Sequence, residues 1–169
     1  TWKNTWKAYT GMVISSLKFR FADVNADGNL DLFAPNTAGT FYFGDGKGGF
    51  KRNDAGLPDR SSEQGLGGLS SGDVNNDGYI DVSIVLNNYI NSTWYFIPQV
   101  FIWDNSTQSW KDSSNGLPDM SSGKNMTNFH QTELADMDND GNVDVVAAGA
   151  YGVVVWKGDG AGKWTYTTR

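Results

Sequence analysis

Acidic and amide side chains recur in three nine-residue segments that share the pattern D-x-[DN]-x-D-G-x-[LIV]-D. The segments are Asp23–Asp31, Asp73–Asp81 and Asp136–Asp144. Oxygen atoms at positions 1, 3, 5 and 9, with the backbone carbonyl at position 7, can converge on one point, and Ca²⁺ takes about six to eight oxygen ligands. The glycine at position 6 permits the positive φ that folds the loop back on an ion. The pattern therefore predicts about three bound Ca²⁺ ions.

The candidate ligands are four side chains and one backbone carbonyl in each loop. They are Asp23, Asn25, Asp27 and Asp31 with the carbonyl of Asn29; Asp73, Asn75, Asp77 and Asp81 with the carbonyl of Tyr79; and Asp136, Asp138, Asp140 and Asp144 with the carbonyl of Asn142. The third loop has one carboxylate more than the others, so charge count predicts that it binds calcium most tightly. Three divalent cations would bring the formal net charge of −6 to zero.

Other interpretations of the loops are weaker. An EF-hand requires a bidentate Glu at position 12 and flanking helices, but position 12 is Ala34, Ile84 or Ala147, which also disfavours the similar dockerin loop. Magnesium fits less well because it keeps several water ligands. Metal-free turns are the remaining alternative, since Asp, Asn and Gly form turns readily. Three or four carboxylates within nine residues would repel one another without a cation, which favours the metal.

Short apolar segments surround each acidic loop and have the length of strands. They are Leu17–Phe21 and the weaker segments 66–69 and 129–134 before the loops; Leu32–Ala34, Val82–Leu86 and Val145–Ala148 directly after them; Thr40–Phe43, Val100–Trp103 and Val153–Trp156 next; and segments that begin at Phe50, Trp110 and Trp164. A Gly-Leu-Pro turn follows the last segment at 56–58 and 116–118. Four antiparallel strands in a repeat of roughly 50 residues are typical of a β-propeller blade.

The intervals between the acidic loops are 50 and 63 residues. The longer interval contains extra residues around 87–98, which we expect to lengthen a hairpin. The aromatic residues of this insertion are more consistent with packing than with a ligand platform.

These features resemble the FG-GAP or VCBS repeat propellers, including the calcium-bearing blades of integrin α subunits. The resemblance rests on the acidic loops, on Phe43-Gly44 with its Gly-Asp-Gly turn and on the aromatic residues that begin the last strands. It implies an all-β fold of blades, each a four-stranded antiparallel sheet. It also implies that each ion lies in the loop between the first two strands of a blade and joins them.

The expected domain organisation is a single propeller segment, 1–169. Residues 1–11 would be the outer strand of a preceding blade, and the three blades would span 12–58, 59–118 and 119–169. A closed propeller has about four to eight blades. The remaining blades would therefore come from a longer chain or from other copies.

Composition excludes several classes of function. The chain has no cysteine, which removes disulfides, cysteine-ligated zinc and thiol nucleophiles. It has an excess of acids and no basic patch, so nucleic acid is not an expected partner, and no segment approaches the roughly 18 apolar residues of a membrane span. His130 is the only histidine, and the common hydrolase and P-loop motifs are missing. We therefore predict no catalytic residue and no enzyme activity.

The resemblance implies a secreted or cell-surface module that binds a glycan or a protein, for example in adhesion. Calcium at extracellular concentrations would fill even weak sites, which favours this location. The alternative is a structural or accessory propeller of a larger extracellular enzyme acting on polysaccharides, or of a surface assembly. Glycosylation sequons at Asn91, Asn105 and Asn125 fit a secreted protein but are also expected by chance.

Overall fold

The computed structural model describes residues 19–36, 39–58, 68–90, 92–118, 128–150 and 152–167. Within these ranges β-strands are the only regular secondary structure. They are β1 (Arg20–Ala22), β2 (Asp31–Asn36), β3 (Gly39–Gly44), β4 (Phe50–Arg52), β5 (Leu69–Gly72), β6 (Asp81–Ile90), β7 (Thr93–Asp104), β8 (Ser109–Asp112), β9 (Phe129–Ala135), β10 (Asp144–Gly149), β11 (Gly152–Gly158) and β12 (Trp164–Tyr166). The prediction of an all-β chain is confirmed for the described residues, and none of them belongs to a helix that could cross a membrane.

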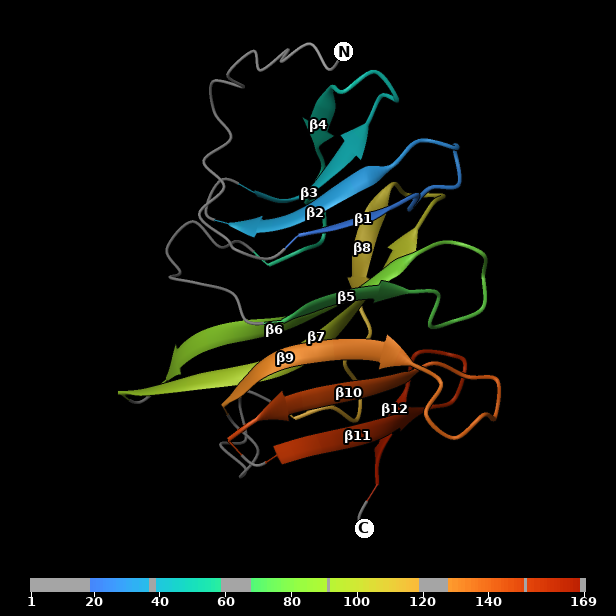
Figure 1. Cartoon of the computed structure of the whole chain (residues 1–169). Helices are drawn as coiled ribbons and strands as arrows, with labels where there is room; N and C mark the ends of the chain where they lie inside the picture. The colour runs from blue at the N-terminus through green and yellow to red at the C-terminus, as the bar shows by residue number, and fades with distance from the viewer. Residues whose placement is uncertain are drawn as a thin grey trace, which may run out of the picture.

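The strands form three four-stranded antiparallel sheets, each a simple meander in chain order. The orders are β1-β2-β3-β4, β5-β6-β7-β8 and β9-β10-β11-β12. Each acidic loop joins the first and second strands of its sheet, and Figure 1 shows all three loops at the same edge of the molecule. The prediction of four-stranded antiparallel sheets is therefore confirmed for the described residues. The outer strand expected within residues 1–11 lies outside the described residues.

The second sheet has a much longer hairpin than the others. Strands β6 and β7 pair without interruption from Val82 opposite Phe101 to Ile90 opposite Thr93. Figure 1 shows this hairpin projecting beyond the neighbouring sheets. The extra residues around 87–98 thus lengthen a hairpin, as predicted. Trp94, near its tip, is 46% exposed.

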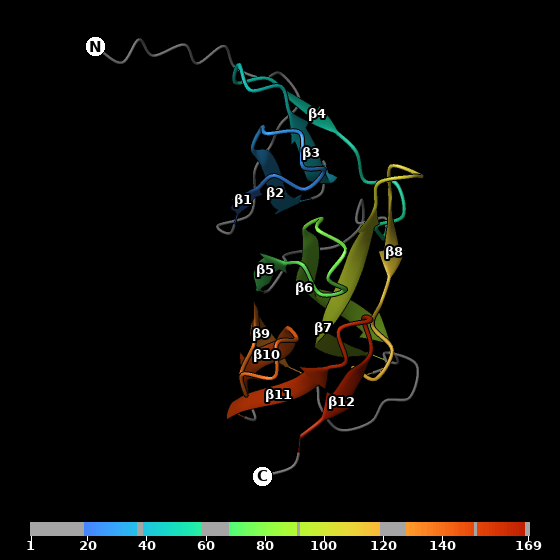
Figure 2. The same cartoon turned by 90° about the vertical axis from the view of Figure 1, so that its right-hand side faces the viewer.

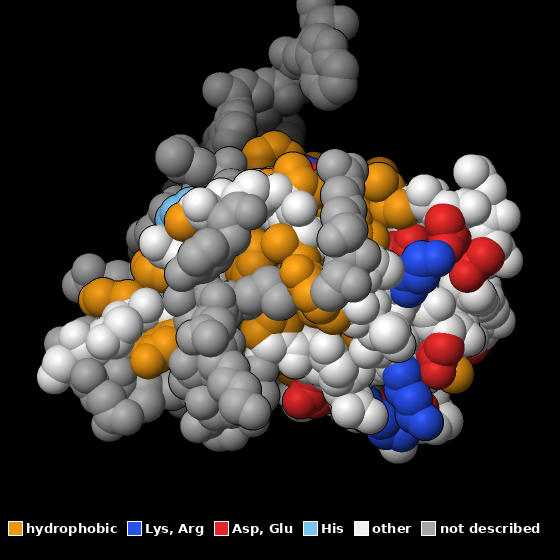
Figure 3. Space-filling view, turned by 90° about the horizontal axis from the view of Figure 1, so that it is seen from below, with side chains coloured by type: hydrophobic (Ala, Val, Ile, Leu, Met, Phe, Trp, Pro, Cys, Tyr) orange, Lys and Arg blue, Asp and Glu red, His pale blue; other side chains and the backbone are white. Residues whose placement is uncertain are grey.

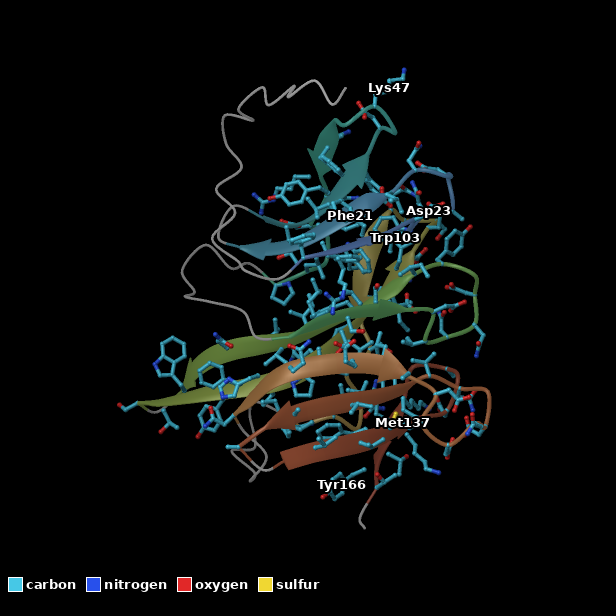
Figure 4. The ribbon with its side chains drawn as sticks, viewed as in Figure 1. Phe21, Asp23, Lys47, Trp103, Met137 and Tyr166 are labelled. Atoms are coloured by element: carbon cyan, nitrogen blue, oxygen red, sulfur yellow. The ribbon has the colours of Figure 1, made fainter. Side chains whose placement is uncertain are left out.

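The sheets pack face to face through apolar cores. Alternate side chains of a strand point to opposite faces, so β6 contributes to both cores. Val82 belongs to the cluster that contains Phe33 of the first sheet, and Val85 belongs to the cluster that contains Val145 of the third. Figure 4 shows Trp103, which is fully buried, between the first and second sheets.

The Gly-Leu-Pro turns connect neighbouring sheets. After the last strand of the first sheet, the carbonyl of Ala55 accepts a hydrogen bond of 2.7 Å from the N–H of Trp110, in the last strand of the second sheet. The N–H of Trp164 donates to Asn115 in the same way, at 3.0 Å. Gly56 has φ of 89°, and a Cβ there would lie 1.9 Å from the Trp110 carbonyl oxygen. The repeated turn therefore requires glycine where one sheet contacts the next.

The three sheets are arranged in the same orientation. In Figure 2 the first strands β1, β5 and β9 lie along one side, and the last strands β4, β8 and β12 lie along the other. A buried hydrogen bond of 2.7 Å between the hydroxyls of Ser83 and Thr132 joins β6 to β9. This arrangement brings the loops at the ends of the first strands to one surface of the stack.

Candidate metal centre

The three acidic loops share one backbone conformation. Each has two residues with positive φ, at position 4 and at position 6. They are Ala26 (57°), Asn76 (58°) and Asn139 (60°) at position 4, and Gly28 (86°), Gly78 (88°) and Gly141 (91°) at position 6. The positive φ predicted for the glycine is confirmed, whereas the left-handed residue at position 4 was not predicted. Two left-handed residues so close together curl the backbone around the side chains of the loop.

The first aspartate of each loop accepts two backbone hydrogen bonds from within the loop. Oδ1 of Asp23 accepts from the N–H of Asp27 at 3.0 Å, and Oδ2 accepts from Gly28 at 2.8 Å. Asp73 and Asp136 accept the equivalent bonds at 2.9 to 3.2 Å. These bonds turn the carboxylate toward the interior of the loop. Each oxygen keeps a second lone pair that can bind a cation.

The aspartates at position 5 are held in a second set of hydrogen bonds. The N–H of Asn29 donates to Oδ1 of Asp27 at 2.8 Å, and the N–H groups of Tyr79 and Asn142 make the same bond in their loops. This bond lowers the pKa of Asp27 because it favours the ionised carboxyl. The hydrogen bond therefore orients position 5 in each loop, and in the first loop it also favours the charged carboxylate.

The aspartates at position 9 are fully buried. Oδ2 of Asp81 accepts from the N–H of Val74 at 2.9 Å, and Oδ1 accepts from the N–H of Trp103 at 2.9 Å. Asp31 and Asp144 accept the same pair of bonds in their own sheets. Burial raises the pKa of Asp81 to about 7 and also raises the pKa of Asp31. Besides its predicted role as a ligand, position 9 thus fastens the loop to the third strand of the sheet.

The third loop brings three carboxylates closest together. One oxygen from each of Asp136, Asp138 and Asp144 lies within 4.8 Å of the others, and no other such acidic group occurs among the described residues. Lys157, from the end of β11, forms an ion pair with Asp138. The lysine lowers the pKa of Asp138. Sequence reasoning did not identify Lys157 because it lies 13 residues after the loop and in no shared motif.

The donor set of the loops fits calcium. All fifteen predicted ligand residues lie in the described part of the chain, and the carboxylates at positions 1, 5 and 9 are oriented by the same hydrogen bonds in each loop. Every candidate donor is an oxygen atom, which suits a hard cation and disfavours metals that prefer nitrogen or sulfur. Asp140 is not part of the closest group in the third loop. Calcium itself stays a prediction.

A polar groove lies beside the second acidic loop. It has a volume of about 500 Å³ and is lined by residues of the loop and of β7 and β8, among them Asp77, Tyr79, Asp104 and Lys111. Lys111 forms an ion pair with Asp104 and lowers the pKa of that carboxyl. The hydroxyl of Tyr79 accepts a hydrogen bond from Asn105 at 3.1 Å. The groove thus offers both charges and an aromatic ring.

The single histidine lies at the start of β9, whereas the acidic loop of this sheet follows the end of that strand. His130 is exposed on β9, with its ring centre 5.7 Å from that of Phe96.

No model of a known protein family, no curated protein and no solved structure matches the chain. What the chain does must therefore follow from its own loops, cores and surfaces.

Proposed function

We propose that the chain is a calcium-stabilised β-propeller segment that serves as a binding or adhesion module outside the cell. The observation that carries the proposal is the hydrogen-bond pattern that recurs in all three acidic loops and turns their carboxylates inward. Without a metal, three or four carboxylates in the same place would repel one another. One ion in each loop would offset their mutual repulsion.

The role proposed for calcium is structural. Each loop connects the first two strands of a sheet, and its last aspartate already fastens the loop to the third strand. An ion bound to the same aspartate would join these three strands at one point. Because the chain has no cysteine, this cross-link would stand where a small secreted domain often has disulfides.

The propeller is supported by the way in which the sheets cover one another. Phe41 of β3 and Val100 of β7 are fully buried between sheets. Phe41 and Val100 each lie three residues before the N–H that donates to the aspartate at position 9, and the equivalent residue of β11 is Val155. Val155 faces away from the second sheet. Its neighbour Val153 is 69% exposed, and Figure 3 shows hydrophobic side chains near the centre of this lower face. We infer that a further blade, from a longer chain or another copy, covers it.

Two surfaces support binding of a glycan or a protein. One is the polar groove beside the second acidic loop, where carboxylates, amides and a lysine can exchange hydrogen bonds with hydroxyl groups. The other is the long β6–β7 hairpin, where Trp94 is exposed and its ring centre lies 6.3 Å from that of Phe96. Exposed aromatic rings can stack on sugars or form the centre of a protein contact.

A second candidate function is a scaffold within a larger extracellular enzyme that acts on polysaccharides, or within a surface assembly. The observation that favours it is the burial of four of the five tryptophans in the described part of the chain. These are Trp103, Trp110, Trp156 and Trp164. Most tryptophans there serve packing, which leaves Trp94 as the exposed indole.

The proposal is tested in two steps with the whole chain. Thermal unfolding is followed in EDTA, in 10 mM CaCl₂ and in 10 mM MgCl₂. If the dissociation constant is about 0.1 mM, calcium adds about 2.7 kcal/mol per site, and magnesium adds much less. A melting temperature that is the same in EDTA and in calcium would refute the structural role of the ion.

Ligand binding is then measured on a glycan array with calcium-loaded protein. Binding that is lost in a Trp94→Ala variant, or in a Tyr79→Ala variant that alters the groove, would support the module and identify the surface. If no glycan binds at high protein concentration and no protein partner is captured in calcium, the scaffold is favoured instead.

A further inference from the structure

Lys157 places a positive charge at the third acidic loop. Its ammonium group pairs with Oδ2 of Asp138, and the two side chains are 48% and 30% exposed, respectively. An oxygen of Asp138 lies within 4.8 Å of oxygens of Asp136 and Asp144. The lysine is therefore a cation at the edge of the carboxylate group that would receive calcium.

Among the residues that the structure describes, none forms a counterpart of this ion pair with the first two loops. The N–H of Gly158 donates to Asp144 as that of Gly44 donates to Asp31 and that of Trp103 donates to Asp81. The residues just before these three donors therefore occupy the same place in their sheets. They are Lys157 in the third sheet, Phe43 in the first and Ile102 in the second. Only the third sheet has a charged side chain at this place.

The difference extends to position 3 of the loop. Asn25 and Asn75 each donate an amide hydrogen bond to the aspartate at position 5, at 3.1 and 2.9 Å. The third loop has Asp138 instead, whose negative charge is paired with Lys157. The additional carboxylate and the lysine compensate each other, so the third loop together with Lys157 carries the same formal charge as each of the other two loops.

We propose that Lys157 acts as an internal competitor of calcium and makes the third loop the weakest and most readily emptied of the three sites. This inference rests on the proposed calcium function and reverses the ranking expected from charge count alone. Calcium has to displace the ammonium group from Asp138 before that carboxylate can serve as a ligand. Without calcium, the lysine holds together a loop that would otherwise contain four uncompensated carboxylates.

The effect of the lysine is large enough to measure. An ammonium group about 5 Å from a divalent ion repels it even in a dielectric close to that of water, by an amount equivalent to roughly tenfold or more in affinity. Because Lys157 is half exposed and Phe43 and Ile102 are apolar, Lys157→Met is expected to fold normally. Lys157→Arg keeps the charge and is the matched control.

The experiment is a calcium titration of the whole chain, followed by the backbone amide signals of Gly28, Gly78 and Gly141 in ¹H–¹⁵N NMR spectra. Each of these amides donates to the first aspartate of its own loop and reports that loop alone. In the parent chain we expect Gly141 to respond at the highest calcium concentration. Lys157→Met is expected to lower the midpoint for Gly141 by about tenfold and to leave the other two midpoints unchanged. Lys157→Arg is expected to leave all three unchanged.

The possible failures are distinguishable. If Gly28 and Gly78 respond to calcium but Lys157→Met leaves the Gly141 midpoint where it was, the competitor role is wrong and the calcium function stands. If none of the three amides responds to calcium at 10 mM, both the calcium function and the role of Lys157 are overturned. In EDTA, Lys157→Met is expected to speed hydrogen exchange at Gly141, and unchanged exchange would contradict the role of the lysine in the metal-free loop.

Discussion

The buried aspartate at position 9 gives the sharpest mutational test, because it has two separable roles. Asp81 accepts hydrogen bonds from the N–H groups of Val74 and Trp103, each at 2.9 Å, and it is also a proposed calcium ligand. Asp77, in the same loop, is exposed and is a proposed ligand too, but its hydrogen bonds with Tyr79 and Asn75 lie at the surface. Replacing each by alanine therefore separates fastening of the loop from binding of the metal.

The magnitude follows from the orphaned donors. Asp81→Ala leaves two buried N–H groups without an acceptor, at about 1 to 3 kcal/mol each, and part of this loss is offset because a buried carboxyl is removed. We expect a net loss of about 3 kcal/mol in EDTA, which lowers the melting temperature of a chain of this size by roughly 10 °C. Asp77→Ala removes exposed hydrogen bonds and is expected to lose about 1 kcal/mol or less.

The assay is thermal and urea-induced unfolding of both variants, in EDTA and in 10 mM CaCl₂. Both variants are expected to lose the calcium-dependent stabilisation of this loop, but only Asp81→Ala is expected to be strongly destabilised in EDTA. Asp81→Asn keeps one acceptor oxygen, so its stability in EDTA is expected to lie between those of the other two variants. It takes the place of Asp81→Ala if that variant does not fold. Equal stability of Asp81→Ala and Asp77→Ala in EDTA would refute the fastening role of position 9.

Three further predictions concern the backbone, the sheet contact and pH. Ala26 has φ of 57° where the other loops have Asn, so Ala26→Asn is expected to stabilise the chain by about 0.5 to 1 kcal/mol, measured by urea unfolding, with Asn76→Ala as the opposite change. Ser83→Ala leaves the buried Thr132 hydroxyl without its partner and is expected to lower the free energy of unfolding by about 1 to 3 kcal/mol. The double variant Ser83→Ala with Thr132→Val is expected to be nearly as stable as the parent chain. Additive losses in the double variant would contradict the contact. Burial raises the pKa of Asp81 to about 7. The contribution of this group to the free energy of unfolding in EDTA is therefore fully present below about pH 4 and is lost as pH rises through 7. Asp81→Asn is expected to flatten this part of the melting temperature profile, and an unchanged slope would contradict it.

Much of the fold could be predicted because each repeat consists of short apolar segments separated by turn residues. The apolar runs after each acidic loop correspond to β2, β6 and β10, and the inserted residues lengthen the hairpin in which they were expected. Local pattern was sufficient here because each sheet is a meander of neighbours in sequence. The segment predicted at 66–69 overlaps the short strand β5 (Leu69–Gly72) only at Leu69, and residues 66 and 67 lie outside the described part of the chain; β5 also packs against β9.

The candidate site was predictable in composition but not in all of its contacts. The spacing of the acidic residues identified the carboxylates, and the glycine at position 6 predicted the left-handed turn. The fastening role of position 9 depends on the N–H of a residue 13 to 22 positions later, such as Gly44 or Trp103, and is visible only when the third strand is in place. Lys157 was missed for the same reason, because sheet register and not sequence spacing brings it to Asp138.

The central claim is that each acidic loop holds one calcium ion. The most direct measurement is a calorimetric titration of the EDTA-treated and dialysed chain with CaCl₂, extended to 10 mM, with a parallel titration of MgCl₂ as the control. We predict three calcium ions per chain, two taken up first and the third at higher concentration, with little heat from magnesium. No calcium-dependent heat, or a stoichiometry that stays the same when Asp27 and Asp77 are both replaced by alanine, would contradict the account.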